Sequence, residues 1–209
     1  MDVLRRTLGG FINHPNFASV LVVGLGCEAN QISALLEIEG IEISRQVRTL
    51  IMQEAGGTAA AVEAGVEIVR EMLAEADLVS RTVLPISNLT LGLQCGGSDG
   101  FSAITANPAL GAGVDLLVRN GGTAILSETT EIYGAEHMLL RRVVSEKVGK
   151  DLRALLDWWT EYTVRNNTAM DNNPSPGNKA GGLTTIFEKS LGAAAKRGTT
   201  DLCAVYKYA

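Results

Sequence analysis

The segment from Gly92 to Gly111, GLQCGGSDGFSAITANPALG, combines reactive side chains with a glycine-rich backbone. Its reactive groups are a thiol, a hydroxyl and a carboxylate, supplied by Cys95, Ser98 and Asp99. The glycines between and beside them are Gly96, Gly97 and Gly100. Glycines let a backbone approach a ligand closely and present N–H groups in a concave nest that suits a carboxylate ligand. A helix is expected from Phe101 onwards, and its N-terminal dipole would favour the same anion. The alternative is a tight turn that Asp99 caps.

The segment from Ser127 to His137, SETTEIYGAEH, is dense in oxygen and imidazole donors. The donors are Glu128, Glu131, Tyr133, Glu136 and His137. Such a group suits a divalent cation or a pair of residues that transfers a proton. A helix predicted over Glu131–Ser145 would place Tyr133 and His137 on one face, with Glu136 beside them. A solvated helix N-terminus enriched in acidic residues explains the glutamates equally well.

A third segment, NPSPGNKAGGLTTIFEKSLG, places Lys179 among prolines and glycines just before a predicted helix. It belongs to a longer stretch, Asn166–Gly182, that has no apolar periodicity and is predicted to be a functional loop. A lysine held there could bind a carboxylate, or act as a base if its pKa is lowered. The alternative is an ordinary solvated lysine.

Two short sequences echo each other, because GLGC at Gly24–Cys27 and GLQC at Gly92–Cys95 each follow an apolar segment. In open α/β sheets ligands bind beyond the carboxyl ends of the strands, so both cysteines are expected on the binding side, unless the echo is due to chance. The first turn also matches the dinucleotide fingerprint through Gly24, Gly26 and Ala29. That match is weak, since an acidic residue in the expected context is missing.

The elements that must position these residues alternate between short apolar and longer amphipathic segments. The predicted strands are Ser19–Val23, Val47–Met52, Leu89–Leu93 and Thr123–Leu126. The predicted helices are Thr58–Ala76, Glu131–Ser145, Gly149–Asn166 and Thr184–Lys196. In the first helix an expected core stripe is formed by Val62, Val66, Val69 and Leu73. The alternation predicts an α/β fold, with a mainly parallel sheet flanked by helices in a Rossmann-like three-layer arrangement.

Composition narrows the class of protein. A chain of 209 residues with 46% hydrophobic content is expected to form one domain, with a possible subdivision near residues 80–90. The net charge of −5 and the scattered Lys and Arg argue against nucleic acid as a partner. No apolar run approaches the roughly 20 residues that span a bilayer, and no signal peptide is evident, so a cytoplasmic protein is expected. The odd number of cysteines, three, favours free thiols.

Taken together, four motifs in this order resemble the altronate dehydratase and galactarate dehydratase family, which includes a sulfolactate sulfo-lyase subunit. They are HPNFASVLVVGLGCEANQ, GLQCGGSDGFSAITANPALG, GGTAILSETTEIYGAEH and NPSPGNKAGGLTTIFEKSLGAAAKRGTT. The resemblance runs from His14 to Ala209. It implies that a small β-rich N-terminal domain and a C-terminal remainder are absent, so the chain is expected to be the middle piece of the enzyme and inactive alone.

The resemblance also implies an activity and a cofactor. Family members dehydrate sugar acids to 2-keto-3-deoxy acids in hexuronate and hexarate catabolism, with Fe²⁺ or sometimes Mn²⁺. Removing a proton α to a carboxylate needs a base together with a cation or hydrogen-bond donors.

Residue chemistry suggests a role for each candidate in that reaction. The metal ligands are predicted to be Cys27, Glu28, Cys95 and Asp99. The substrate-binding residues are predicted to be Gly96, Gly97, Ser98 and Asn178. Lys179 or His137 would be the base, with Glu136 and Tyr133 in support. A small sugar acid and further copies of the chain are the expected partners, together with the absent domains.

Three other functions remain open from the sequence. The chain could act on sulfolactate, as the sulfo-lyase relative implies. It could also be a non-catalytic piece that folds and oligomerises. A nucleotide-dependent oxidoreductase would rest on the Gly24 turn alone.

Overall fold

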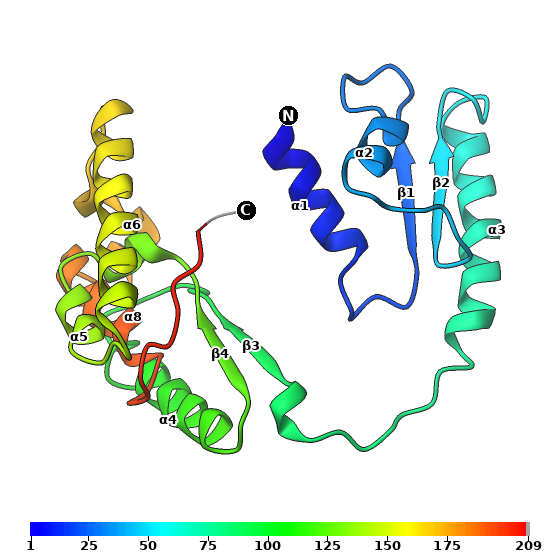
Figure 1. Cartoon of the computed structure of the whole chain (residues 1–209). Helices are drawn as coiled ribbons and strands as arrows, with labels where there is room; N and C mark the ends of the chain where they lie inside the picture. Colours follow the sequence, from blue (N-terminus) through cyan, green and yellow to red (C-terminus); the bar gives the residue numbers. More distant parts are fainter. Residues whose placement is uncertain (208–209) are drawn as a thin grey trace. The chain divides into compact units, whose positions relative to one another are not determined.

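The computed structural model describes residues 1–207, which form two compact units. The first unit runs from Met1 to Thr82, and the second begins at Val83. This boundary lies inside the range 80–90 at which the sequence suggested a subdivision. Each unit has its own strand pair and its own helices, and each is described by itself below (Figure 1).

The first unit is built around two parallel strands. Its elements are α1 (Asp2–Ile12), β1 (Val20–Gly24), α2 (Ile32–Ile38), β2 (Val47–Ile51) and α3 (Thr58–Ala76). The register of the strand pair runs from Val20 opposite Val47 to Gly24 opposite Ile51. Helices α1 and α2 lie on one side of the strands and α3 on the other (Figure 1). The core of this unit is formed by Ile32, Leu36 and Ile41, with Ile12, Val22, Val47 and Ile51 packed against them.

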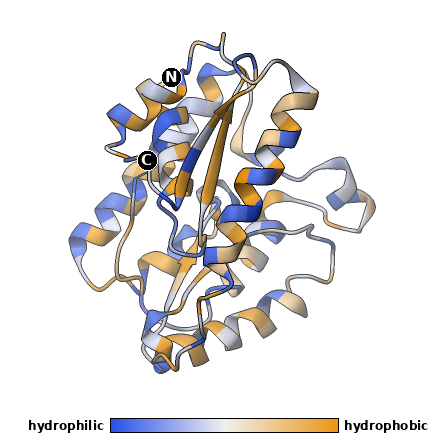
Figure 2. Ribbon diagram, turned by 90° about the vertical axis from the view of Figure 1, so that its right-hand side faces the viewer, coloured by the Kyte–Doolittle hydropathy of each residue, from blue (hydrophilic) through white to orange (hydrophobic). Residues whose placement is uncertain are grey.

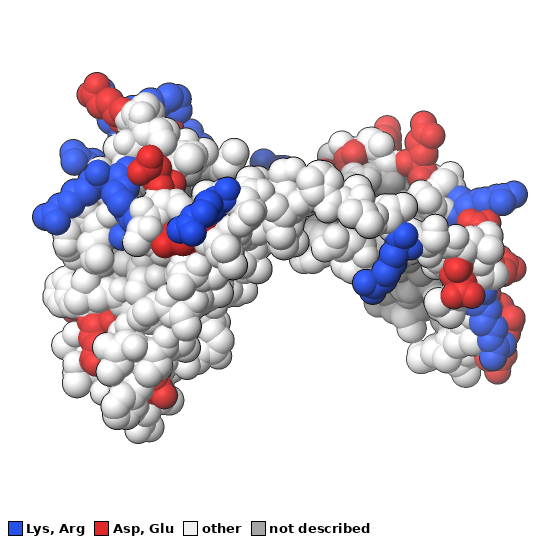
Figure 3. All heavy atoms as spheres, turned by 90° about the horizontal axis from the view of Figure 1, so that it is seen from below, with Lys and Arg blue, Asp and Glu red and all other residues white. Residues whose placement is uncertain are grey.

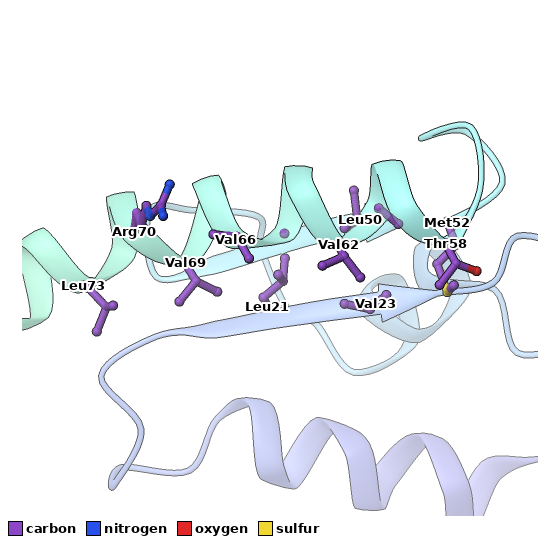
Figure 4. A pocket seen from close by; sticks show the side chains of 12 residues that line it. Leu21, Val23, Leu50, Met52, Thr58, Val62, Val66, Val69, Arg70 and Leu73 are labelled. Carbon is purple, nitrogen blue, oxygen red and sulfur yellow. The ribbon is translucent and has the colours of Figure 1, made fainter.

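Helix α3 has the predicted bounds, but its apolar stripe is not core. Val62 and Leu73 are each 59% exposed, and the buried residues of the helix are Ala61 and Met72. Figure 4 shows the stripe facing β1 across a groove of about 480 Å³. The stripe stays accessible because a sheet of two strands covers only part of the helix face. Thr58 is the first helical residue and not the cap, because Gly57 holds the cap position.

The second unit contains the other strand pair and most of the helices. It begins with η1 (Ile86–Asn88), β3 (Thr90–Leu93), α4 (Ala106–Arg119) and β4 (Thr123–Leu126). It continues with η2 (Thr129–Ile132), α5 (Glu136–Leu140), α6 (Glu146–Arg165), η3 (Met170–Asn172), α7 (Pro176–Ala180) and α8 (Ile186–Ala195). Strands β3 and β4 are parallel, in a register from Thr90 opposite Thr123 to Leu93 opposite Leu126. The core is formed by Ile132, Ala135, Leu139, Leu152, Leu156 and Ala194.

The predicted elements of this unit are largely confirmed, with the following corrections. Helix α8 begins after Thr185, whose hydroxyl accepts the Glu188 N–H as a helix cap should. The helix predicted over Glu131–Ser145 is wrong, because η2 and the short α5 replace it. Gly134, with a φ of +85°, adopts a left-handed conformation between the two and interrupts the helix. The helix expected from Phe101 begins at Ala106, and the predicted loop Asn166–Gly182 contains η3 and α7.

The fold is therefore a mixture of helices and small parallel sheets, as an α/β class requires. Hydropathy colouring shows mostly apolar strands and helices that carry both apolar and polar faces (Figure 2). The mainly parallel pairing is confirmed within each unit, whereas the Rossmann-like three-layer arrangement stays a prediction. Among the described residues, no helix is both long and apolar enough to cross a bilayer. Basic and acidic side chains are interspersed on the face shown in Figure 3.

Candidate functional site

Three potential ligand residues converge where strands β3 and β4 end. Cys95 follows the last residue of β3 by two positions, and Glu128 follows the last residue of β4 by two. Because parallel strands end at the same edge of a sheet, the two side chains are brought together. Glu131 joins them from η2, and one donor atom from each of the three residues lies within 4.8 Å of the others. The structure thus pairs the two donor-rich segments of the sequence.

The position of Glu128 depends on an uncommon backbone conformation. Its φ of 61° and ψ of 59° lie in the left-handed region, which costs a residue with a Cβ on the order of 1 kcal/mol. The Oε2 atom of Glu128 accepts the Cys95 N–H at 2.6 Å, and its carbonyl accepts the Glu131 N–H at 2.8 Å. Glu128 is therefore hydrogen-bonded to both other members of the cluster.

Glu131 is buried between two buried lysines. All three residues are only 4% to 7% exposed: Glu131, Lys189 and Lys196. Lys189 Nζ lies 2.8 Å from Glu131 Oε1, and Lys196 Nζ lies 3.7 Å from Glu131 Oε2. Lys189 also donates to Asn173 Oδ1 at 2.7 Å. Burial of charged groups is costly unless they are paired, so the glutamate and the two lysines depend on one another to remain charged in the core.

The lysine pair was missed by sequence reasoning, although a signal was present. Lys189 lies within the Ala-rich helix α8, and Lys196 caps its C-terminus seven residues later, so the two lysines lie on the same side of the helix. That face packs on η2, which carries Glu131. Periodicity of charged residues within an otherwise apolar helix face would have identified them.

The glycine loop after Cys95 is fixed at its ends and open in its middle. Gly100 N–H donates to the Gly181 carbonyl at 3.0 Å, and the Asn178 side-chain amide donates to the Ser98 carbonyl at 2.9 Å. Gly96 and Gly97 have open space where a Cβ would lie. The loop thus presents an accessible backbone beside the cluster. It brings Ser98 and Asn178, two predicted substrate-binding residues, into direct contact.

Asp99 forms the tight turn that was the alternative interpretation of its segment. Its Oδ1 accepts hydrogen bonds from the Ser102 hydroxyl at 2.8 Å and from the backbone N–H groups of Phe101 and Ser102 at 3.0 and 2.8 Å. The Ser102 hydroxyl is the main cause that lowers the pKa of Asp99, followed by those two N–H groups. Asp99 is not a member of the three-residue cluster. Its role as a metal ligand stays a prediction.

The predicted base and its supporting residues are spread over two helices and the turn that follows η2. His137 is exposed on α5, and Lys179 is exposed on α7. Glu136 begins α5 with one buried carboxylate oxygen that has no hydrogen-bond partner. Tyr133 follows η2 and precedes that helix, so it does not share a helical face with His137. Their catalytic roles stay predictions.

Cys27 and Glu28 belong to the first unit, where they follow β1. Cys27 is exposed. The Glu28 carboxylate accepts the backbone N–H groups of Leu25 and Gly26. The pKa of Glu28 is lowered, first by its own backbone N–H and then by that of Gly26. The joint site predicted for these residues and Cys95 stays a prediction.

Comparison with known families accounts for both units. The family described as "D-galactarate/Altronate dehydratase, C-terminal" matches residues 86–209. The family described as "D-galactarate dehydratase/Altronate hydrolase, second domain" matches residues 1–77. The two matches together cover nearly the whole chain. The chain therefore belongs to the D-galactarate/altronate dehydratase family, as its motifs predicted.

Individual relatives agree with this assignment. The chain is 41% identical over 205 residues to the altronate dehydratase of Bacillus subtilis, with 98% of this chain and 40% of the relative covered. It is 41% identical over 206 residues to the galactarate dehydratase (L-threo-forming) of Escherichia coli, with 96% of this chain and 39% of the relative covered. A (2R)-sulfolactate sulfo-lyase subunit beta of Chromohalobacter salexigens is 31% identical over 200 residues, or 95% of this chain and 50% of the relative. The chain thus spans about 40% of the length of the two dehydratases.

Proposed function

We propose that this chain supplies part of the active site of a hydro-lyase that removes water from a sugar acid, altronate or galactarate, to give a 2-keto-3-deoxy acid. The observation that carries the proposal is the match of both units to dehydratase families. Identity of 41% along nearly the entire chain to relatives named for these two substrates supports the same substrate class.

The second unit has the groups that such a substrate requires. A sugar acid carries a carboxylate, and removal of the adjacent proton places further negative charge on that group. The open backbone at Gly96 and Gly97 would bind the carboxylate through N–H groups, with Ser98 and Asn178 holding the loop in shape. The buried lysines beside Glu131 contribute positive charge near the same edge of the sheet.

The base and the metal belong to the same proposal. Lys179 or His137 would remove the α-proton, with Glu136 and Tyr133 in support; closure of the site around the substrate would have to bring an exposed base to it. A divalent ion, Fe²⁺ or Mn²⁺, would supply Lewis acidity that stabilises the developing charge and helps the hydroxyl leave. The thiol and carboxylates at the ends of β3 and β4 fit such an ion by donor type.

The direct test is formation of a 2-keto-3-deoxy acid from altronate and from galactarate by the protein that carries this sequence, with Fe²⁺ added. We expect turnover of at least one acid and a loss of roughly 100-fold or more in Glu128→Gln. The control is Glu63→Gln, at an exposed glutamate of α3, which should keep full activity. If neither acid is consumed, the proposal is wrong.

The proposed roles of individual residues are separable from the function. His137→Ala and Lys179→Ala separate the two candidate bases: the variant that lacks the base should abolish turnover without unfolding the protein, as judged by circular dichroism. Near-normal activity of a folded variant would remove that residue from the mechanism. The 209-residue chain alone is expected to be inactive, because it spans only part of its relatives.

A second candidate is favoured by the sulfo-lyase relative. That relative is named as a subunit acting on (2R)-sulfolactate, and elimination of sulfite next to a carboxylate begins with the same proton removal. Release of sulfite from (2R)-sulfolactate, with no consumption of either sugar acid, would favour this function. A third outcome, in which the protein only assembles into homo-oligomers, would leave all three substrates unchanged.

A further inference from the structure

We infer that Cys95, Glu128 and Glu131 are the protein ligands of a single divalent metal ion, and that Cys27, Glu28 and Asp99 are not. The inference deepens the proposed function and rests on it for the use of the ion in catalysis. Binding of the ion is a separate property that can be measured without turnover. The argument depends on which donor atoms of the cluster are already engaged.

Each carboxylate of the cluster has one oxygen held in a close contact of 2.6 to 2.8 Å, which leaves its second oxygen for an ion. Glu128 Oε2 accepts the Cys95 N–H, and Glu131 Oε1 lies 2.8 Å from the Lys189 ammonium. The other oxygen of Glu128 takes no part in that contact with Cys95. The Cys95 thiol lies 3.4 Å from the Ser98 hydroxyl, a weak interaction that a metal ion could replace. One sulfur and two oxygens are thus left, one from each residue.

The second oxygen of Glu131 is an independent indication of a ligand. Glu131 is 5% exposed, and its Oε2 is buried without a hydrogen-bond partner; the Lys196 ammonium is 3.7 Å away. A buried carboxylate oxygen without a hydrogen bond is costly, and native proteins usually satisfy such an atom with a partner, water or an ion. A cation held jointly with Cys95 and Glu128 would satisfy it.

The cluster is also held in place before any ion binds. Glu128 occupies its left-handed backbone conformation, and its carboxylate and carbonyl are tied to Cys95 and Glu131 respectively. Glu131 is fixed by Lys189, which is in turn bonded to Asn173. Outer contacts of this kind orient metal ligands and commonly change metal affinity about 10-fold to 100-fold when removed.

The donor types indicate which ions should bind. A thiolate beside two carboxylates suits Fe²⁺, Co²⁺, Zn²⁺ or Mn²⁺ better than Mg²⁺ or Ca²⁺, which prefer oxygen alone. Three protein ligands leave at least one coordination position for water or substrate, as in catalytic zinc sites. Two lysines and two glutamates balance in charge, so a divalent ion with one thiolate leaves a net positive site. Such a site attracts an anion.

Two of the competing ligands predicted from the sequence, Glu28 and Asp99, are engaged in their own turns. Both oxygens of Glu28 accept backbone N–H groups of their own turn, and Asp99 Oδ1 accepts three hydrogen bonds of its turn. These interactions stabilise the two turns without any ion.

The test is titration of the metal-free, reduced 209-residue chain with Co²⁺, followed by absorption spectroscopy and calorimetry. A thiolate bound to Co²⁺ gives an intense near-ultraviolet charge-transfer band. We expect one ion per chain and such a band, which Cys95→Ser abolishes and the matched controls Cys27→Ser and Cys203→Ser retain. Glu128→Gln and Glu131→Gln should each weaken binding by about 10-fold or more. Asp99→Asn should bind as the unchanged protein does.

Three results would overturn the inference. They are no Co²⁺ binding by the folded chain, a charge-transfer band that persists in Cys95→Ser, and a band that disappears in Cys27→Ser. Glu131→Gln removes a buried charge and could unfold the second unit, so Glu128→Gln and Cys95→Ser, at half-buried residues, carry the decision. Metal binding with no turnover of any substrate would reject the proposed function and leave the metal site intact.

Discussion

At the scale of single residues, Glu131 is the centre of the charge network in the second unit. It is buried, it is paired with Lys189 and Lys196, and it reaches Cys95 and Glu128. A group with so many partners cannot be replaced without leaving another charge unpaired. Its surroundings therefore serve both stability and the chemistry of the site.

Removing Lys189 should be far more costly than removing an exposed lysine with an equally short ion pair. Lys189→Met leaves Glu131 with only the more distant Lys196, and loss of one partner of a buried pair costs roughly 3 to 5 kcal/mol. The control is Lys150→Met, because Lys150 lies 2.7 Å from Glu146 on the solvent side of α6 and should cost under about 1 kcal/mol. Urea unfolding of both variants measures the difference. Equal losses would show that the buried network contributes no more than the exposed pair.

How far the sequence predicts this site differs from residue to residue. The convergence of Cys95 and Glu128 follows from strand ends, which apolar runs locate well. Sequence reasoning included Glu131 in the donor-rich segment but missed Lys189, because a long-range pair depends on how α8 packs on η2. The turn geometry of Asp99 was open between two interpretations, and only the hydrogen bonds decide it.

At the scale of elements, α3 shows why a predicted stripe does not determine burial. Its bounds are as predicted, since periodicity and composition are local properties. Whether Val62 or Ala61 is covered depends on the strands beneath, and the pair β1 and β2 is too narrow to cover the whole face (Figure 4).

Two neighbouring residues of α3 should therefore differ in how much an introduced charge destabilises the first unit. Ala61 is 5% exposed and Val62 is 59% exposed. Ala61→Asp buries an unpaired carboxylate and should destabilise the first unit by roughly 2 to 4 kcal/mol. Val62→Asp should cost less than about 1 kcal/mol, because its carboxylate remains in water. Thermal unfolding monitored by circular dichroism compares them, and a larger loss in Val62→Asp would mean that the groove is covered.

Helix α4 is joined to the segment after α8 by a carboxylate whose effect should depend on pH. Thr199 donates to Asp115 through its N–H at 2.6 Å and its hydroxyl at 2.8 Å. Burial raises the pKa of Asp115, but the hydrogen bonds from Thr199 and Thr200 together lower it below the ordinary value. The pKa of Asp115 is therefore lower in the folded protein than in the unfolded chain. Its carboxylate stabilises the fold fully at pH values above the unfolded pKa, and this stabilisation is lost as the pH falls through the folded pKa.

Asp115→Asn should accordingly cost about 1 kcal/mol at neutral pH and progressively less in acid. Urea unfolding of the two proteins at a series of pH values measures this difference. The matched control is Asp157→Asn, at an exposed aspartate of α6, which should show a difference near zero throughout. A gap between Asp115→Asn and the unchanged protein that widens on acidification would contradict the assigned role.

At the scale of the whole molecule, the two units have separate cores and match separate domain families. The core around Ile32 lies entirely within residues 1–82, and the core around Ile132 lies entirely beyond them. Likewise, the match to the second-domain family ends at residue 77, and the match to the C-terminal family begins at residue 86. The sequence analysis allowed a subdivision near residues 80–90, but composition alone could not show that each side has its own core.

The segment between the units should be the first site of limited proteolysis. Leu78, Val79, Val83 and Leu84 are 67% or more exposed, and residues 79–85 lie outside any helix or strand. Exposed backbone without ladder or helix hydrogen bonds is cut before folded elements are. A brief digestion with chymotrypsin, read by mass spectrometry, should give fragments that meet between residues 78 and 85. Because neither core crosses the boundary, the circular dichroism spectra of separately expressed residues 1–82 and 83–209 should sum to that of the whole chain. A sum with markedly less helix would show that one unit needs the other in order to fold.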